Sequence, residues 1–363
     1  MNFNIPLLKP IRIILFPFSL IYYAVIYIRN RLFDNKILST SSFGLPIICV
    51  GNIAVGGTGK SPMVEFLLRN LGNKYNLATL SRGYKRKTKG YVLADANTNA
   101  LDIGDEPMQF HLKFPGVAVA VGEERILAIP QLLHDRKDTR AIILDDAFQH
   151  RAIQAGYNIL LTEYANLYTR DWYLPTGDLR DEKSSVKRAD LIIVTKCPAD
   201  LSQSEAEAIR KELNPLPEQQ VFFAGIRYGN LYHIIHHLPY QVTGDIEVLL
   251  VSGIANPRPL KKLLADQSQT YEEMAYSDHH IFTIDDMKEI SRRFEQMTGK
   301  LKIILTTEKD AVRLVKFEQE LKDIPLYVIP IEMEFLFGDT DRFCRLIGTF
   351  IEQFSAAAKP TDE

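Results

Sequence analysis

The stretch ICVGNIAVGGTGKSP, residues 48–62, runs from an apolar segment through a glycine cluster to a lysine and a hydroxyl residue. This order is typical of a strand, a phosphate-binding loop and a helix. The strict pattern of a glycine, four residues and Gly-Lys-Ser/Thr is not met, because Ala54 stands where the first glycine is expected. Pro62 suits the first turn of a helix, where no backbone N–H is required. We therefore predict a loop that holds a phosphate at the positive end of a helix.

The glycines of this loop allow positive φ and leave room for backbone N–H groups to approach phosphate oxygens. The candidate nucleotide-binding residues are Gly56, Gly57, Thr58, Gly59, Lys60 and Ser61. The lysine is expected to reach the β- and γ-phosphates, and the serine hydroxyl is expected to ligate Mg²⁺. A glycine-rich turn without a ligand is the alternative.

A second apolar run, AIILDD at residues 141–146, ends in two aspartates, as a Walker B element does. Asp145 or Asp146 would hold Mg²⁺ directly or through water. Gln149 and His150 follow closely enough to act as outer ligands or to position water. Paired aspartates after a strand also occur as a turn or a helix cap, but the lysine loop favours the metal site.

Short apolar runs alternate with helical patterns around the loop, which is the signature of a parallel sheet covered by helices. The predicted strands are residues 46–50, 77–80, 117–121, 141–144, 158–161 and 191–195, and the predicted helices are residues 62–71 and 123–134. The strands are apolar because both faces of such a sheet are buried. The predicted fold class is α/β, with a parallel-sheet domain like that of P-loop NTPases.

The length of 363 residues suggests two domains. A polar, proline-bearing joint near residues 215–219 precedes a second α/β set, with strands at 221–224, 248–251, 302–305 and 326–329 and helices from 257, over 284–297 and near 309–315. The predicted domains are an N-terminal helix region at 1–38, a P-loop domain at 39–220, a smaller α/β domain at 221–354 and a disordered tail at 355–363.

Composition and charge exclude several classes of protein. The formal net charge of −2 gives no overall attraction to nucleic acid, so we predict no nucleic-acid partner, and we predict no obligate protein partner. Cys49, Cys197 and Cys344 lie far apart in the sequence, which favours neither a disulfide framework nor a zinc site. A reducing, cytosolic environment fits this cysteine usage.

The N-terminus carries a charge-free run, IILFPFSLIYYAVIYI at residues 13–28. It is shorter than the about 20 apolar residues of a full membrane span and contains Pro17. Its tyrosines and basic flanks favour a helix held at or partly in an anionic membrane face. The flanking basic residues are Lys9, Arg12, Arg29, Arg31 and Lys36. The alternative is an apolar helix packed on the core of the protein.

Two classes of P-loop protein fit these features. One is a kinase that transfers the γ-phosphate to a hydroxyl, and the other is a membrane-associated switch with a protein partner that hydrolyses nucleotide to drive a conformational change. A kinase needs a group that orients and deprotonates the acceptor. Asp105 and Glu106 precede a predicted helix over residues 107–113, and Asp105 could accept the hydroxyl proton. A favourable interaction with the helix N-terminus is the alternative for either acid.

Two further stretches carry candidate chemistry. Ser277-Asp278-His279-His280 places imidazoles in the second domain, where one could pair with Asp105 across a cleft, or form a polar loop or a metal site. The basic stretch SRGYKRK at residues 81–87 follows a strand, at the edge where such sheets bind ligands. It would neutralise an anionic acceptor or lipid headgroups, or form a solvated run of charge.

Taken in order, eight short blocks resemble the tetraacyldisaccharide 4'-kinases, which phosphorylate a lipid A precursor with ATP in Gram-negative bacteria. The blocks are VGNIAVGGTGKSP (50–62), SRGY (81–84), GDE (104–106), DDAFQH (145–150), LPTGDLR (174–180), GIANP (253–257), DH (278–279) and TEKDA (307–311). They cover most of the chain to about residue 312. The ordered set is far more specific than any single block.

The resemblance implies a P-loop domain with an N-terminal membrane helix, joined to a smaller α/β domain across a cleft. It implies ATP and Mg²⁺ as cofactors, and a glycolipid substrate, tetraacyldisaccharide 1-phosphate, whose 4'-hydroxyl receives the γ-phosphate. That substrate is embedded in the cytoplasmic face of the bacterial inner membrane. The protein is therefore expected at this face, associated with anionic lipids through its N-terminal helix.

The resemblance also implies roles for single residues. Asp105 would be the catalytic base and His279 its partner, while Lys60 would bind the phosphates and Arg125 would stabilise the transferring phosphoryl group. The implied substrate-binding residues are Arg82 and Glu106, and the implied metal ligands are Ser61, Asp145, Asp146 and Gln149.

This sequence departs from the family pattern at three places. Ser61 stands where threonine is usual, and Ala147 stands where glycine is frequent; the hydroxyl and the backbone are preserved. Leu179-Arg180-Asp181 stands where Arg-Glu-Pro is common, and the resemblance assigns Asp181 no role.

Overall fold

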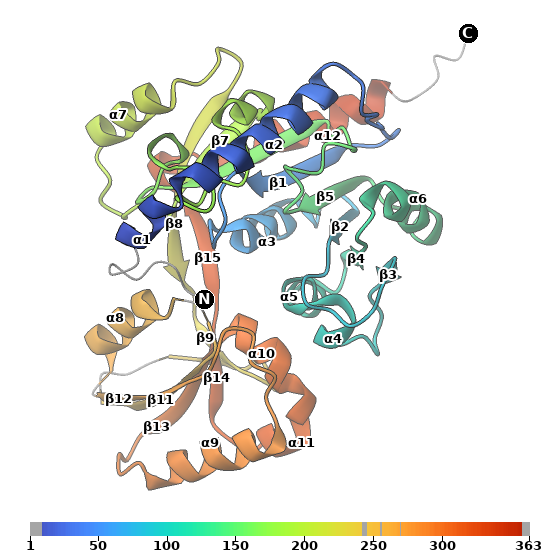
Figure 1. Cartoon of the computed structure of the whole chain (residues 1–363). Coiled ribbons are helices and arrows are strands. Elements are labelled where there is room, and N and C mark those ends of the chain that lie inside the picture. Colours follow the sequence, from blue (N-terminus) through green and yellow to red (C-terminus); the bar gives the residue numbers. More distant parts are fainter. Residues whose placement is uncertain (1–8, 242–244, 255, 269, 358–363) are drawn as a thin grey trace. The chain divides into compact units, whose positions relative to one another are not determined.

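A computed structural model describes residues 9–241, 245–254, 256–268 and 270–357 of the chain (Figure 1). The chain divides into two compact units. The first comprises the chain up to Ile226 together with the chain from Met333, and the second is Arg227–Glu332. The chain passes from the first unit to the second within one strand, β8, and returns within another, β15.

The first unit contains a sheet whose described strands number nine, in the order β15-β8-β7-β6-β1-β5-β2-β4-β3. Their bounds are β1 Ile47–Asn52, β2 Leu77–Ser81, β3 Val92–Leu93, β4 Ala118–Val121, β5 Ala141–Asp145, β6 Tyr157–Glu163, β7 Leu191–Thr195, β8 Gln220–Tyr228 and β15 Ile331–Phe335. The pairs from β8 across to β4 are parallel, and β3 is antiparallel to β4. The six strands predicted in this region are therefore confirmed.

Helices pack on both faces of this sheet. Their bounds are α1 Lys9–Ile14, α2 Phe16–Asp34, α3 Lys60–Leu71, α4 Ala100–Ile103, α5 Asp105–Lys113, α6 Arg125–Asp135, α7 Gln203–Leu213 and α12 Thr340–Ala357. On one face, Cys49 and Leu144 share a buried cluster with Leu132 of α6 and Ile209 of α7. Their neighbours along β1 and β5 point to the other face, where α3 contacts both strands.

The C-terminal segment belongs to the first unit, which corrects the predicted smaller domain over residues 221–354. Four aromatic side chains explain its return. The ring of Phe343 on α12 lies 4.5 Å from that of Phe335 on β15, 5.6 Å from that of Phe222 on β8 and 5.8 Å from that of Phe66 on α3, measured between centroids. Burying these rings fixes β15 and α12 on the larger sheet.

The predicted tail also differs from the structure, because α12 continues to Ala357. Residues 358–363, the rest of that prediction, lie outside the described residues.

The second unit is a smaller α/β sandwich with a sheet whose described strands follow the order β10-β9-β14-β13-β11-β12. The strands are β9 Leu231–His233, β10 Pro239–Tyr240, β11 Glu247–Ser252, β12 Thr270–Ala275, β13 Lys302–Thr307 and β14 Leu326–Ile329, and the helices are α8 Arg258–Gln267, α9 Ile284–Gln296, α10 Glu308–Leu314 and α11 Glu318–Leu321. The buried Asp310 carboxylate accepts hydrogen bonds from Gly253 N (3.1 Å) and Thr307 Oγ1 (2.7 Å). Asp310 thereby joins the end of β11 to the turn before α10.

The N-terminal region is helical, as predicted, but it is divided into α1 and α2 at Leu15. Pro17 lies in the first turn of α2, where its missing N–H removes no helical hydrogen bond. Within the described part of the chain, no helix has both the length and the apolar character needed to cross a membrane. The region also packs on the first unit and is not a separate domain: Ser19 Oγ donates to Thr176 Oγ1 (2.7 Å), and Arg12 pairs with Asp178 (2.7 Å).

Candidate functional site

The loop between β1 and α3 has the backbone that a phosphate site requires. Gly56 and Gly59 have φ values of 108° and 88°, which a side chain would disfavour. A Cβ atom built at Gly56 or Gly57 would meet no atom within 4 Å, so the loop backbone faces open space. Ala54 instead forms an isolated antiparallel bridge with Leu179. An extended residue in such a bridge needs no positive φ, which explains why this position tolerates alanine.

The ends of two strands, β1 and β7, hold the loop in place. Asn52, the last residue of β1, donates from Nδ2 to Thr58 Oγ1 at 2.8 Å. Thr195, the last residue of β7, donates from Oγ1 to the carbonyl oxygen of Thr58 at 2.8 Å. Both contacts are buried, so the loop is held before any ligand binds. Neither supporting role was predicted from the sequence.

Lys60 opens α3 and lies between an amide and a carboxylate. Its Nζ is 3.4 Å from Asn52 Oδ1 and 3.8 Å from Asp146 Oδ1. Burial lowers the pKa of Lys60, and the charge of Asp146 acts in the opposite direction. The ammonium group is therefore a partly desolvated cation at the start of a helix, where an anion is favoured.

The two aspartates at the end of β5 have different environments. Asp145 is 8% exposed, and its Oδ1 is buried without a hydrogen-bond partner. Burial, followed by repulsion from Asp146, raises the pKa of Asp145 to about 7. Burial also acts to raise the pKa of Asp146, but the nearby charges of Lys60 and Arg180 outweigh it and the pKa is lowered. Asp145 can thus exchange its proton for a bound cation, and Asp146 is already ionised.

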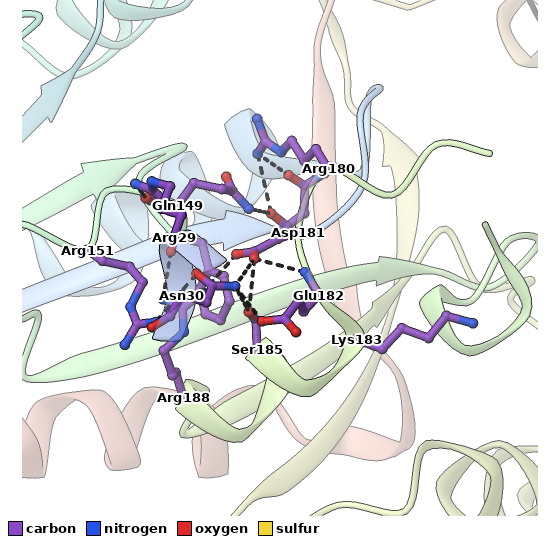
Figure 2. Close-up of polar contacts among 12 residues, drawn as sticks. Arg29, Asn30, Gln149, Arg151, Arg180, Asp181, Glu182, Lys183, Ser185 and Arg188 are labelled. Carbon is purple, nitrogen blue, oxygen red and sulfur yellow. Dashed lines mark hydrogen bonds and ion pairs between the residues drawn. The ribbon is translucent and has the colours of Figure 1, made fainter. Parts of the chain in front are cut away.

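Arg180 is a member of this site that the sequence analysis did not single out. Its side chain is drawn in Figure 2, and its guanidinium contacts both Asp146 and the side-chain oxygen of Asn52. Gln149 reaches the same strand end and donates from Nε2 to the carbonyl oxygen of Asn52 at 2.7 Å. The guanidinium of Arg180 and the amide of Gln149 therefore both contact the end of β1, beside the ionised Asp146.

Backbone hydrogen bonds join the segment around Arg180 to the start of the phosphate loop. The N–H of Arg180 donates to the carbonyl oxygen of Ile53 at 2.8 Å. The N–H of Val55 donates in turn to the carbonyl oxygen of Asp178 at 2.7 Å. The two segments are thus fixed to each other by their main chains, which sets the position from which the Arg180 side chain extends.

Arg125 interacts electrostatically with both carboxylates, and Arg82 and His150 interact with Arg125. Arg125 opens α6 and is 6% exposed, and its Nη1 donates to the carbonyl oxygen of Glu123 at 3.3 Å. Burial lowers the pKa of Arg125, and the charge of Asp145 opposes this shift. Arg82 follows β2 and is exposed, and its charge acts on Arg125. Burial, followed by the charge of Arg125, lowers the pKa of His150 to about 4. His150 is therefore neutral at physiological pH.

Asp105 and Glu106 are the first two residues of α5, as the sequence predicted for a helix start. Gly104 precedes them with a φ of 94°, and a Cβ at that position would lie 2.9 Å from the carbonyl oxygen of Tyr84. The charge of Glu106 acts on both Lys60 and Asp145. The start of α5 therefore lies within electrostatic reach of the phosphate loop.

In the second unit, the two adjacent histidines have different partners. His279 has a φ of 64°, and its Nε2 is 3.1 Å from Lys309 Nζ and 3.7 Å from Asp278 Oδ2. His280 Nε2 lies 3.1 Å from Asp286 Oδ2, the carboxylate that takes part in the capping box of α9. His280 thus has a structural partner. The pairing of Asp105 with His279 stays a prediction.

Among the described residues, no group of three or more His, Cys, Asp or Glu side chains is placed to hold a metal ion. The predicted ligand set contains two such residues, Asp145 and Asp146, together with Ser61 and Gln149. Ser61 lies in the first turn of α3, Asp145 is the last residue of β5, and Asp146 follows it. The predicted metal ligands come from the loop and strand ends described above, and their roles stay predictions.

Comparison with known proteins places the chain among its relatives. A family model described as tetraacyldisaccharide-1-P 4'-kinase matches residues 11–352. The chain is 42% identical over 354 residues to the tetraacyldisaccharide 4'-kinase of Bacteroides thetaiotaomicron, covering 93% of each chain. It is 45% identical over 327 residues to that of Flavobacterium johnsoniae, covering 90% of this chain and 93% of the relative.

A solved structure resembles the whole fold. The crystal structure of LpxK from Aquifex aeolicus in complex with ATP superposes with a TM-score of 0.74 at 26% sequence identity, covering 94% of this chain and 99% of that chain. Family match, relatives and fold agree over nearly the full length. The chain therefore belongs to the tetraacyldisaccharide-1-P 4'-kinase family.

Proposed function

We propose that this protein transfers the γ-phosphate of ATP to the 4'-hydroxyl of a tetraacyldisaccharide 1-phosphate. The proposal rests mainly on the geometry of the phosphate loop, in a chain that belongs to this kinase family. The loop has an open glycine backbone, and Lys60 lies 3.8 Å from Asp146. Positioning and charge stabilisation account for most of the catalysis of phosphoryl transfer, and this loop supplies both.

The nucleotide is assigned to the N-terminal end of α3. The backbone N–H groups of residues 56–59 would cradle the phosphates, with Lys60 on the β- and γ-phosphates. Arg125, buried beside Asp145, would stabilise the charge that develops on the transferring group.

The side chains present fit Mg²⁺. The buried Asp145 Oδ1 has no hydrogen-bond partner, and Mg²⁺ prefers one or two carboxylates together with water and phosphate oxygens. Asp145 and Asp146 would hold the ion directly or through water, with Ser61 and Gln149 completing the set. The ion would neutralise charge on the β- and γ-phosphates when bound.

The acceptor sugar is assigned to the start of α5. Asp105 would take the proton of the 4'-hydroxyl, while Glu106 and Arg82 would bind the sugar head. Arg82 is exposed after β2, which suits contact with an anionic substrate.

Incubation with γ-labelled ATP, Mg²⁺ and a tetraacylated disaccharide 1-phosphate tests the function. We expect the label to appear on the lipid after chromatography, and only when the glycolipid is present. The variant Lys60→Ala is the negative control. Release of the label as inorganic phosphate at a rate independent of the glycolipid would instead identify a nucleotide-hydrolysing switch and refute the proposal.

The affinity for Mg²⁺ is expected to depend on pH through Asp145. Its pKa is raised from 3.8 to about 7, so the folded protein holds a proton there that Mg²⁺ must displace. Affinity should rise about tenfold per pH unit below 7 and level off above it. Mg²⁺ titrations with nucleotide between about pH 5.5 and 8.5 measure this slope. The variant Asp145→Asn controls for titration of the nucleotide itself, and an equal slope in that variant would contradict the assignment.

The raised pKa of Asp145 also affects the folding stability of the protein when no metal is bound. The folded state binds a proton at Asp145 more tightly than the unfolded chain does. The contribution of this group is therefore favourable to folding below the unfolded pKa and is lost as the pH rises towards 7.

We further propose that α2 binds the membrane surface at the cytoplasmic face of the bacterial inner membrane. Its buried residues include the polar Ser19 and Asn30. Up to Ile28 its exposed side chains are instead largely apolar, with Ile21 64% and Val25 60% exposed. This exposed apolar face, followed by basic residues near the end of the helix, suits an interface of anionic lipids.

Replacing Ile21 and Val25 together with glutamine is expected to weaken binding to anionic vesicles at least about tenfold, because each buried aliphatic side chain contributes about 1.5–3 kcal/mol. Vesicle co-sedimentation measures the effect. Leu238→Gln, at a side chain that is 65% exposed in the second unit, is the matched control. Unchanged sedimentation of the double variant would exclude α2 as the anchor.

A further inference from the structure

Asn30 is a buried polar residue on the helix whose exposed face is apolar. It is 2% exposed, and its Nδ2 donates to Asp181 Oδ1 at 2.9 Å and to Glu182 Oε2 at 2.8 Å (Figure 2). Two buried carboxylates thus share one amide donor. Loss of that donor would cost Asp181 one of its hydrogen bonds and would remove the amide partner of Glu182, at a position where buried charges require partners.

Asp181 is the centre of this network, which we call the Asn30–Asp181 network. It is 1% exposed, and its Oδ1 also accepts from Ser185 Oγ at 3.0 Å. Its Oδ2 accepts from Arg188 Nη2 at 3.0 Å. Arg188 is held in turn by the carbonyl oxygen of Phe148 at 2.8 Å. Hydrogen bonds from three side chains therefore fix the Asp181 carboxylate.

The residue before Asp181 reaches the nucleotide site. The Arg180 guanidinium contacts Asp146 and Asn52, the same two residues that lie beside Lys60. Figure 2 shows the Arg180 side chain and the Asp181 carboxylate extending to different neighbours. The peptide bond between Arg180 and Asp181 therefore connects the Asn30–Asp181 network to the charged groups around the phosphate loop.

Other contacts bind the same elements together. Arg29 of α2 donates from Nη2 to the carbonyl oxygen of Gln149 at 2.8 Å, and Gln149 donates to Asn52. Tyr22 OH lies 3.4 Å from the carbonyl oxygen of Arg180. Helix α2 is thus connected to the site through Gln149 and, separately, through the Arg180–Asp181 segment.

We propose that Asn30 and Asp181 are positioning residues that hold Arg180 in the nucleotide site and so couple helix α2 to nucleotide binding. The inference rests on the proposed binding of ATP at the phosphate loop. Arg180 adds a cation where the phosphates bind, and a guanidinium stabilises phosphate oxygens only in a defined orientation. The helix is then a structural part of the nucleotide site as well as the proposed membrane contact.

A double-mutant cycle on the full chain, without lipid, tests this coupling. The affinity for MgATP is measured for the parent, Asn30→Leu, Arg180→Ala and the double variant. We expect each single change to weaken binding about tenfold. The double variant should bind no more than about threefold more weakly than Arg180→Ala, because both changes remove the same contact.

The cycle separates positioning from general destabilisation. Asp190→Ala is the matched control: its carboxylate accepts from Asn158 N at 2.7 Å in the same unit, at the start of β7 and away from the loop. All variants are assayed where circular dichroism shows them folded. Asn30→Ser replaces Asn30→Leu in the cycle if the leucine variant does not fold.

The coupling would be overturned if the losses of MgATP affinity in the two single variants multiplied in the double variant. It would also be overturned if the Asn30 variant bound MgATP as tightly as the parent. A loss in Asp190→Ala equal to that in the Asn30 variant would overturn it too. These results would leave the proposed function intact. Failure of the parent to bind MgATP would overturn both.

Discussion

Replacing Lys60 with alanine is expected to lower kcat about 10²- to 10³-fold and to weaken nucleotide binding as well. The ammonium group is partly desolvated and lies 3.8 Å from Asp146 and 3.4 Å from Asn52. Charge stabilisation by a fixed cation in such a site contributes about 3–4 kcal/mol to the transition state. Steady-state kinetics with the glycolipid, together with calorimetric titration of nucleotide, separates the two effects.

Lys74→Ala is the matched control for this prediction. Lys74 follows the other end of α3 and forms an exposed ion pair with Glu352 at 2.7 Å. Exposed pairs contribute little to stability, so this variant should behave like the parent. Nucleotide affinity and kcat of Lys60→Ala within about threefold of the Lys74→Ala values would refute the assignment of the phosphate loop.

Replacing Asp105 with alanine is expected to lower kcat about 10²- to 10⁴-fold, the range that general base catalysis contributes. The KM for MgATP should change little, because the base acts on the acceptor hydroxyl. A lowered kcat with a nearly unchanged KM for MgATP distinguishes Asp105 from Lys60, which acts on both nucleotide binding and transfer. Asp105→Asn, which keeps the shape of the side chain but cannot take the proton, should show a similar loss.

Asp102→Ala serves as the control in the same segment. Its carboxylate takes part in the capping box of α4, so its loss costs about 1 kcal/mol of local stability without removing the proposed base. A kcat for Asp105→Ala as high as that of Asp102→Ala would exclude Asp105 as the base. A large rise in the KM for MgATP would indicate a role in nucleotide binding instead.

The sequence predicted those parts of the site that depend on local patterns. The apolar runs at β1 and β5 form strands as predicted, Lys60 lies at the start of α3, and Asp145 is the last residue of β5. In a parallel sheet these ends meet at one edge, so local pattern and topology together were sufficient.

Contacts between distant segments could not be predicted in this way. Arg180 reaches Asn52 across 128 positions, and the LPTGDLR block gives no local signal for that approach. Ala54 breaks the expected glycine pattern because it pairs with Leu179, which is again a distant partner. The helix α7 was missed although Ser202 and Glu205 form a capping box, a local signal that was available.

The return of β15 and α12 to the larger sheet has a consequence for synthesis of the chain. A ribosome completes the second unit before it releases Phe335 and Phe343, the rings that pack on Phe222 of β8. Until then β8 is an uncovered edge strand with an exposed aromatic face, which is prone to wrong pairing. The nascent protein therefore depends on β15 and α12, which are made after the second unit, to close the larger sheet. Chaperones that recognise exposed aromatic segments have a defined interval in which to act.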